Sequence, residues 1–283
     1  MAATDPMGSR ARDALTTGGP GRGSIAFRRT VDRTVLARAF ATSPLRILTP
    51  RNHGHAAWVF LSSFGGGLVD GDAVDLILDA EPDSSGLVCT QASTKVYRSP
   101  RGCSQRLEVH VAEGATMAIL PDPVVPFAGA RYTQRVDVSL AANASLLLFD
   151  ATSCGRAARG ERWQLARLES RTEITRAGEP IFVDATLLDP AHGSIAERMA
   201  PYEWVASLVA IGPRFADVRR AMLGPLAPST DDATSVWAAS PLQDDGVVVR
   251  VAAHRFENAS HVLRPSFRSL ARWLGDDPFA RKW

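Results

Sequence analysis

Apolar and polar residues alternate along the first two thirds of the chain with the two-residue period of β-strands. Residues 74–79 and 107–111 carry an apolar side chain at every second position, and residues 167–173 alternate charged with uncharged side chains. A strand with this pattern buries one face and exposes the other. The region from about residue 24 to residue 188 is therefore predicted to be a succession of strands.

Turn residues separate these strands at a spacing of roughly 30 residues, a period typical of stacked repeats. The turns are at residues 81–83, 113–114, 141–143 and 177–179. Each is followed by an apolar strand that ends in polar residues, among them Thr90, Asp122, Asp150 and Asp184. We expect successive strands to bring these groups to one edge, or into one channel, of a layered β structure.

The pattern changes after Pro190. Residues 203–211 and 246–253 are predicted to be strands, and residues 215–223 a short helix. Residues 258–274 are predicted to be a longer helix, with Pro265 near its start or at a kink. The chain is thus expected to be mainly β with about two helices in the C-terminal third.

The domain organisation is predicted from composition along the chain. Residues 1–23 are rich in Gly, Ser, Thr and Arg and are predicted to be a disordered tail. No linker rich in Pro, Gly or Ser interrupts the remainder of the chain, so residues 24–283 are expected to form a single domain.

Composition and charge exclude several classes of function. The net charge of +2 and the absence of basic clusters interleaved with aromatic residues argue against a nucleic-acid partner. No run approaches the roughly 18 apolar residues that span a membrane, and the N-terminus has no apolar secretion segment. Three cysteines, at irregular spacing, form no disulfide framework. We predict a cytoplasmic protein.

The first chemical motif is the glycine-rich segment at residues 65–72, GGGLVDGD. A phosphate-binding loop of this kind requires a lysine, a Ser or Thr and a following helix, whereas here Asp72 and a strand follow. The carboxylates also lack the spacing of a calcium loop. Two interpretations stay open: a tight connection between strands, or a loop in which Asp72 lines a polar passage or an interface.

Two further motifs combine polar groups with apolar neighbours. Residues 90–98, TQASTKVYR, include Ser93 and Lys95, a possible nucleophile pair, but without any oxyanion-hole signature. A buried hydrogen-bond network is the simpler interpretation. Lys95 is also one of only two lysines among the 32 basic residues. The loop at residues 155–161, GRAARGE, is either a salt-bridged turn or a docking loop.

The six histidines are dispersed, and no third ligand accompanies the close pair His53 and His55. The sequence therefore supports no permanent metal site. Weak, transient contact of a metal ion with carboxylate and hydroxyl oxygens remains compatible with it.

Four motifs in order, GGGLVDGD, TQASTKVYRS, LPDPVVPFAGAR and FDATSCGRAARGERW, resemble the UreD/UreH family of urease accessory proteins. The resemblance is strong over residues 24–188 and looser in the C-terminal third. The family's own run resembles GGGLVGGD, so Asp70 replaces a usual glycine. The resemblance implies a mainly β fold with β-helix-like stacking of many short strands and two helices.

The resemblance also implies a function. Such proteins are non-enzymatic scaffolds that bind apo-urease on one side and the accessory proteins UreF and UreG on another, and give nickel a polar route toward the urease active site. No permanently bound cofactor is expected, only transient passage of nickel. Candidates for the route or its mouth are Asp72, Thr94, Lys95, Asp150 and Glu161. Candidates for docking partners or ordering loops are Arg98, Arg131, Arg156 and Arg159.

Two other functions stay open. The first is a β-solenoid hydrolase that uses Asp72 and Asp150 as a carboxylate pair. The second is a purely structural adaptor, in which the polar motifs serve only the fold.

Overall fold

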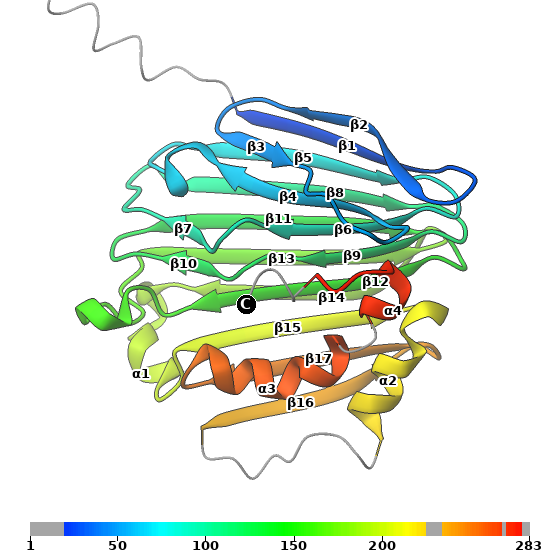
Figure 1. Ribbon diagram of the computed structural model, residues 1–283. Helices are drawn as coiled ribbons and strands as arrows, with labels where there is room; N and C mark the ends of the chain where they lie inside the picture. Colours follow the sequence, from blue (N-terminus) through cyan, green and yellow to red (C-terminus); the bar gives the residue numbers. More distant parts are fainter. Residues whose placement is uncertain (1–19, 225–233, 268–269, 279–283) are drawn as a thin grey trace, which may run out of the picture.

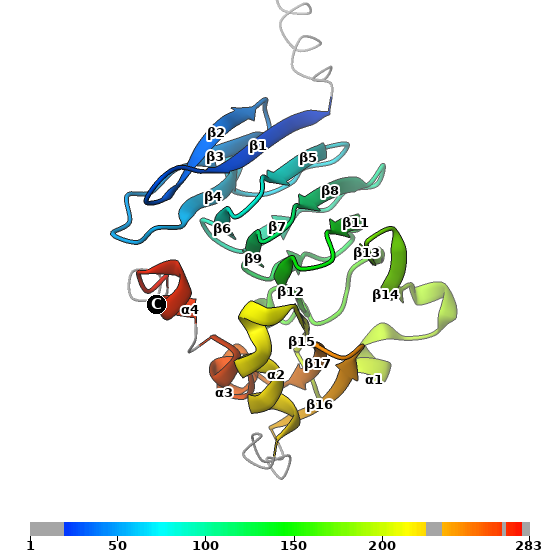
Figure 2. The same cartoon turned by 90° about the vertical axis from the view of Figure 1, so that its right-hand side faces the viewer.

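The computed structural model describes residues 20–224, 234–267 and 270–278, whose strands form two layered sheets of seven and ten strands (Figures 1 and 2). The seven-stranded sheet has the order β14 (Glu179–Leu188), β13 (Arg167–Arg176), β11 (Arg131–Leu140), β8 (Cys103–Val111), β5 (Ala73–Ala80), β1 (Gly21–Arg29), β2 (Thr34–Ala41). The ten-stranded sheet has the order β16 (Ser235–Leu242), β17 (Gly246–Ala253), β15 (Trp204–Ile211), β12 (Ser145–Ser153), β9 (Thr116–Leu120), β6 (Ser85–Thr90), β4 (Ala57–Ser63), β3 (Leu45–Leu48). Two short strands, β7 (Thr94–Val96) and β10 (Val124–Pro126), complete it beside β12.

The chain winds back and forth between the two sheets, and one strand in each sheet together make up one coil of this winding. It runs β5, β6, β8, β9, β11, β12 and β13, and neighbouring coil strands within each sheet are parallel. The predicted turns lie where strands of the two sheets are joined or, at residues 177–178, between β13 and β14. The mainly β prediction with stacked strands is therefore confirmed.

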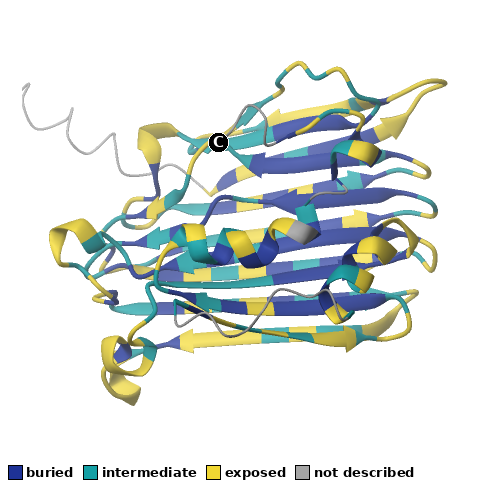
Figure 3. Ribbon diagram, turned by 60° about the horizontal axis from the view of Figure 1, so that its bottom comes forward, coloured by how far each residue is buried: buried dark blue, intermediate teal, exposed yellow. Residues whose placement is uncertain are grey.

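Two apolar cores hold the layers together. One lies between the two sheets and includes Ile195 of the first helix. The other lies between the outer face of the ten-stranded sheet and the remaining three helices. The helices are α1 (Ile195–Met199), α2 (Ala216–Leu223), α3 (Phe256–Phe267) and α4 (Leu270–Leu274), with short 3-10 turns at Phe64–Gly66, Ala157–Arg159, Pro190–His192 and Pro213–Phe215. Figure 3 shows buried residues running along the strands and exposed residues in the turns. None of the described helices has the length and apolar run that crossing a membrane requires.

The two cores explain two sequence patterns. The strands of the seven-stranded sheet alternate because their outer face meets solvent, as in β5. The central strands of the ten-stranded sheet are covered on both faces, so that all five residues of β9 are buried. A strand buried on both faces has a continuous apolar sequence.

Several boundaries differ from the sequence-based expectation. β1 begins at Gly21, so residues 21–23 belong to a strand and not to the predicted tail, whose residues 1–19 lie outside the described part. The helix expected at residues 258–274 begins earlier and is described as α3 and α4. The sequence did not predict β16 or the five-residue helix α1. β16 has no regular alternation of its own, and its pairing with β17 makes it a strand.

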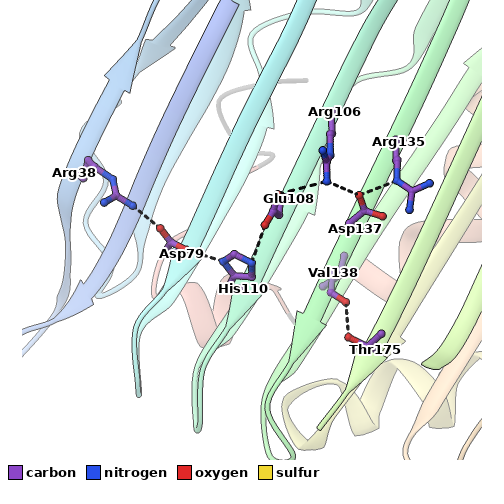
Figure 4. Close-up of polar contacts among 9 residues, drawn as sticks. All are labelled: Arg38, Asp79, Arg106, Glu108, His110, Arg135, Asp137, Val138 and Thr175. Atoms are coloured by element: carbon purple, nitrogen blue, oxygen red, sulfur yellow. Dashed lines mark hydrogen bonds and ion pairs between the residues drawn. The ribbon is translucent and has the colours of Figure 1, made fainter. Parts of the chain in front are cut away.

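Charged residues on the outer face of the seven-stranded sheet form two rows across neighbouring strands. One row is basic and the adjacent row acidic: Arg106, Arg135 and Arg171, then Glu108, Asp137 and Glu173. The rows neutralise one another. Arg135 lies 2.9 Å from Asp137 (Figure 4). It also lies 3.3 Å from Glu173. The network continues through His110, between Glu108 and Asp79. Like charges on neighbouring strands destabilise a sheet unless opposite charges compensate them. The ion pairs between the basic and acidic rows provide this compensation.

Candidate functional site

A cavity of about 270 Å³ lies between the two sheets, at the end where β6, β9 and β12 finish. Its lining includes Thr90, Asp122 and Asp150, which follow or end the apolar runs of these three strands. Thr90 donates to Asp122 at 3.2 Å, and the Asp122 backbone N–H donates back to the Thr90 hydroxyl at 2.7 Å. The expectation that successive strands bring polar groups into one channel is confirmed for these residues.

A second cavity, of about 400 Å³, lies farther along the stack. It is bounded by β13 and β14 on one side and by β15, β17 and β16 on the other. Arg250 of β17 donates to Asp184 of β14 at 3.0 Å, so an ion pair joins the two walls. Asp150 and Thr172 line both cavities, which places them where the two meet.

Asp150 is held from the facing sheet. Ser170 of β13 donates to its carboxylate at 3.4 Å. Burial raises the pKa of the Asp150 carboxyl, hydrogen bonds from Gln134 and Ser170 oppose the rise, and the negative charge of Asp184 adds to it. The protonated form is therefore favoured more than in an exposed aspartate. A cation that entered this region would reverse that preference.

A chain of amide and hydroxyl groups leads away from Asp150 across the seven-stranded sheet. Gln134 donates to the Ser170 hydroxyl at 3.4 Å, and Tyr132 lies 3.0 Å from the Gln134 side-chain oxygen. Tyr132 donates to Gln105 at 2.6 Å, and burial raises the pKa of its phenol well above the ordinary value. Gln105, Gln134 and Ser170 occupy matching register positions on β8, β11 and β13.

The sequence-based reasoning missed these amide and hydroxyl residues. Gln105 and Gln134 are 29 residues apart in the sequence, which is close to the spacing of the turns. Each is a polar residue on the otherwise apolar inner face of its strand. Aligning the repeats by their turns would have placed the two glutamines in the same row.

Of the five residues predicted for the route or its mouth, three are brought together. Thr94, Lys95 and Asp150 all line the first cavity, and Lys95 is exposed, which places it at the rim. Asp72 and Glu161 lie in loops outside the lining of both cavities. Asp72 accepts from the Val69 backbone N–H at 2.8 Å, and therefore orders its own loop. Asp72 and Asp150 do not form a carboxylate pair.

Glu161 is bound by an arginine of its own loop. Arg156 donates to it at 2.8 Å, and this hydrogen bond is the main cause that lowers the pKa of the Glu161 carboxyl. Glu161 also accepts from the Ala128 backbone N–H at 3.2 Å. The Arg156 guanidinium lies 4.2 Å above the Phe127 ring. These contacts make residues 155–161 a salt-bridged turn that also joins two neighbouring coils.

The other predicted arginines are spread along the same side of the stack. Arg98 lies against Gly129, and the exposed Arg159 ends the short turn that contains it. The backbone of Arg131 exchanges hydrogen bonds of 2.9 and 3.0 Å with the Ser99 hydroxyl, while its side chain is exposed.

The glycine-rich segment is a tight connection between strands. Leu68 forms an isolated parallel bridge with Val96, and its N–H donates to the Lys95 carbonyl at 2.8 Å. A Cβ atom on Gly67 would lie 2.6 Å from that carbonyl oxygen, so any larger residue would force the backbones apart. The loop therefore positions Thr94 and Lys95 beside the first cavity.

No group of three or more His, Cys, Asp or Glu side chains among the described residues is arranged to hold a metal ion. The cysteines Cys89, Cys103 and Cys154 are buried free thiols, and burial raises the pKa of Cys154 to about 11. The cavity linings offer hydroxyl, amide and carboxylate oxygens, and they also include Cys89 and the cationic residues Lys95, Arg106, Arg135 and Arg250.

Comparison with known proteins identifies the family. The family model described as UreD urease accessory protein matches residues 19–283. A "Urease accessory protein UreD" of Sorangium cellulosum is 52% identical over 270 residues, which cover 95% of this chain and 86% of the relative. One from Anaeromyxobacter is 41% identical, covering 92% and 89%. "Urease accessory protein D" of Oryza sativa subsp. japonica is 30% identical and covers 99% of each chain. The chain belongs to the UreD family of urease accessory proteins, non-catalytic factors of urease maturation.

Proposed function

We propose that this chain is a scaffold that bridges apo-urease and the accessory proteins UreF and UreG, and that nickel crosses its interior toward the urease active site. The observation that carries the proposal is the position of Asp150 and Thr172, which line both cavities. The lining of both cavities is mostly apolar, and polar groups follow one another within it from the Arg250–Asp184 ion pair, through Asp150, to the rim at Lys95. Membership of a non-catalytic family makes the hydrolase alternative wrong.

The chemistry of the lining supports transit of the ion in preference to storage. Hydroxyl, amide and carboxylate oxygens are weaker ligands for nickel than the imidazole and thiolate groups of tight sites. Conduction requires sites that an ion can enter and also leave. In this proposal Asp150 supplies the strongest attraction, and the hydroxyls of Ser170 and Thr172 supply weaker contacts beside it.

We assign partner binding to the side of the stack that is formed by the loops joining the end of one coil to the start of the next. Arg98, Arg131 and Arg159 are exposed there, and Lys95 adds a cation at the cavity rim. Arg156 instead orders its loop through Glu161. We place the protein in the cytoplasm, without a nucleic-acid or membrane partner and without a permanently bound cofactor.

Co-expression with apo-urease, UreF and UreG tests the proposal, with the assembly isolated by affinity purification and urease activity measured after addition of nickel. The informative variant is Asp150→Asn, which keeps the size of the side chain. We expect it to assemble normally but to reduce nickel-dependent activation. Asp217→Asn, on an exposed turn of α2, is the matched control and should activate urease fully.

The outcomes separate the two roles. If Asp150→Asn assembles and activates as well as the unsubstituted chain, the interior route is wrong and a structural adaptor remains. If the unsubstituted chain neither joins the assembly nor affects activation, the scaffold role is wrong as well.

A further inference from the structure

A row of polar side chains crosses the ten-stranded sheet beyond β12, on the face toward the other sheet. Asp150 of β12 stands beside Ser207 of β15, which stands beside Arg250 of β17, and all three line the second cavity. Neighbouring strands are about 4.8 Å apart, so the backbone of Arg250 lies about 10 Å from that of Asp150. The inward residues of β15 on either side of the row, Val205 and Val209, belong to the apolar core between the sheets. The row is therefore a polar line through an apolar interior.

The opposite sheet supplies polar partners for this row. Thr172 of β13 stands beside Asp184 of β14, and both line the second cavity. Nη2 of Arg250 donates to the Asp184 carboxylate at 3.0 Å. The polar row ends at this ion pair, because the next register position, on β16, is Ala238. A cation that moves beyond Asp150 along the row therefore meets a carboxylate to which a guanidinium is already bound.

The contact between Arg250 and Asp184 is one that can open. Their side chains are 57% and 26% exposed, and a single hydrogen bond joins them. Arg176 makes a firmer contact nearby: it is only 15% exposed and donates two hydrogen bonds of 2.8 Å to Asp245. A half-exposed pair contributes little free energy, because water screens it and a long side chain loses freedom in forming it. Arg250 can therefore turn into solvent at little cost.

The guanidinium opposes a passing cation in two ways. It repels the cation directly, and it occupies the carboxylate that would attract the cation. Coulomb energy is proportional to charge, so a divalent ion attracts a carboxylate twice as strongly as a monovalent ion at the same distance. A nickel ion therefore has an advantage over the guanidinium of Arg250 in competing for Asp184, whereas a monovalent ion has none.

We propose that Arg250 is a gating residue at the β14–β17 end of the nickel route. Bound to Asp184, it closes this end, and it turns into solvent when the divalent ion reaches the Asp184 carboxylate. The inference rests on the proposed function, because that function supplies the ion and its passage by Asp150. It adds the residue that controls one end of the route.

Equilibrium dialysis against nickel tests the gate without any measurement of urease activity. Nickel bound to the full chain is measured over a range of nickel concentrations. Arg250→Gln removes the charge and keeps a polar side chain, and we expect it to bind nickel about fivefold more tightly, because Asp184 is no longer occupied. Arg250→Lys keeps a cation at the gate and should bind nickel as the unsubstituted chain does.

Arg162→Gln is the matched control. Arg162 and Glu203 form an ion pair of nearly the same exposure, 55% and 23%, and also share a single hydrogen bond. Neither residue belongs to the lining of the two cavities. The nickel affinity of Arg162→Gln should therefore equal that of the unsubstituted chain. Thermal unfolding of every variant checks that the fold is retained.

The same variants are then co-expressed with apo-urease, UreF and UreG. We expect Arg250→Gln to assemble normally and to reach half-maximal urease activation at about fivefold lower nickel concentration, in line with its affinity. Asp184→Asn leaves the Arg250 cation without its partner and removes a carboxylate from the route, so it should require more nickel.

The outcomes separate the gate from the route. If Arg250→Gln and Arg162→Gln bind nickel alike while Asp150→Asn reduces activation, the gate is wrong and the route stands. Weaker nickel binding by both Arg250→Gln and Arg250→Lys overturns the gate and identifies the ion pair as a strut between the sheets. Absence of nickel binding by Arg250→Gln at every concentration also overturns it. If Asp150→Asn activates urease fully, the route itself is wrong, and the gate with it.

Discussion

Arg101 binds Asp70 through three hydrogen bonds that close the glycine-rich segment against the next coil. The backbone N–H and Nε of Arg101 donate to the two Asp70 carboxylate oxygens at 2.8 and 2.9 Å. Its Nη2 donates to the Asp70 carbonyl at 2.8 Å. The Asp70 carboxylate therefore gains a partner from the loop that follows β7.

Asp70→Gly should loosen this connection without unfolding the chain. We expect faster hydrogen exchange in residues 65–72 and 99–104 and only a small change in melting temperature, because exposed ion pairs contribute little to global stability. Arg220→Ala, which removes an exposed ion pair on α2, is the control and should leave both loops unchanged. Unaltered exchange in Asp70→Gly would show that the glycines alone order the segment.

The same pair predicts a dependence on pH. The hydrogen bond from Arg101 is the main cause that lowers the pKa of the Asp70 carboxyl. A carboxylate with a lowered pKa stabilises the fold above its unfolded pKa of about 3.9, and this contribution is lost as pH falls through the folded value. The exchange difference between Asp70→Gly and the unsubstituted chain should therefore disappear in acid.

Asp150 should behave in the opposite way. Burial raises the pKa of its carboxyl, so its contribution to folding is most favourable below the unfolded pKa of about 3.9 and is lost as pH rises through the folded value. Asp150→Asn should therefore be as stable as the unsubstituted chain or more stable at pH 7, with a difference that grows from pH 4 upward. Denaturant unfolding at several pH values measures it. If Asp150→Asn is less stable than the unsubstituted chain at pH 7, the folded protein stabilises the charged Asp150 carboxylate through its hydrogen bonds.

Successive residues of β12 should be equally sensitive to truncation. Leu146 packs between the sheets and Leu147 packs beneath the helices, and both are fully buried. Leu146→Ala and Leu147→Ala should each cost about 2–5 kcal/mol in the free energy of unfolding. Val183→Ala on the exposed face of β14 should cost no more than about 0.5 kcal/mol. Near-normal stability of Leu147→Ala would contradict the burial of both faces.

The charged rows on the outer face predict an effect that depends on salt. Arg135→Glu would place a carboxylate beside Asp137 and Glu173 and should destabilise the fold by about 1 kcal/mol, since facing like charges repel across strands. The cost should shrink as sodium chloride is raised, because exposed charges are screened. Arg98→Glu is the control, because Arg98 forms no ion pair within the described part of the chain. An effect that does not respond to salt would point to packing by the arginine stem.

The sequence by itself determined the local elements. Alternation and turn residues predicted most strands of the coil, from the strand that contains Leu76 to the one that contains Ile174, because the two-residue period and the turn chemistry are local properties. The motif order predicted the family. The helix at residues 216–223 was found within one residue, while β16 was missed because its strand conformation depends on pairing with β17.

Only the tertiary structure decided which polar residues meet. Asp150, Ser170 and Gln134 come from three strands that are neighbours only after the coil has closed, and the register of those strands sets their contacts. Asp72 and Glu161, which also carry carboxylates but lie in loops, instead accept hydrogen bonds from a local backbone N–H and a local arginine. A one-dimensional pattern shows where polar groups lie along the chain, whereas packing between layers determines which of them share a cavity.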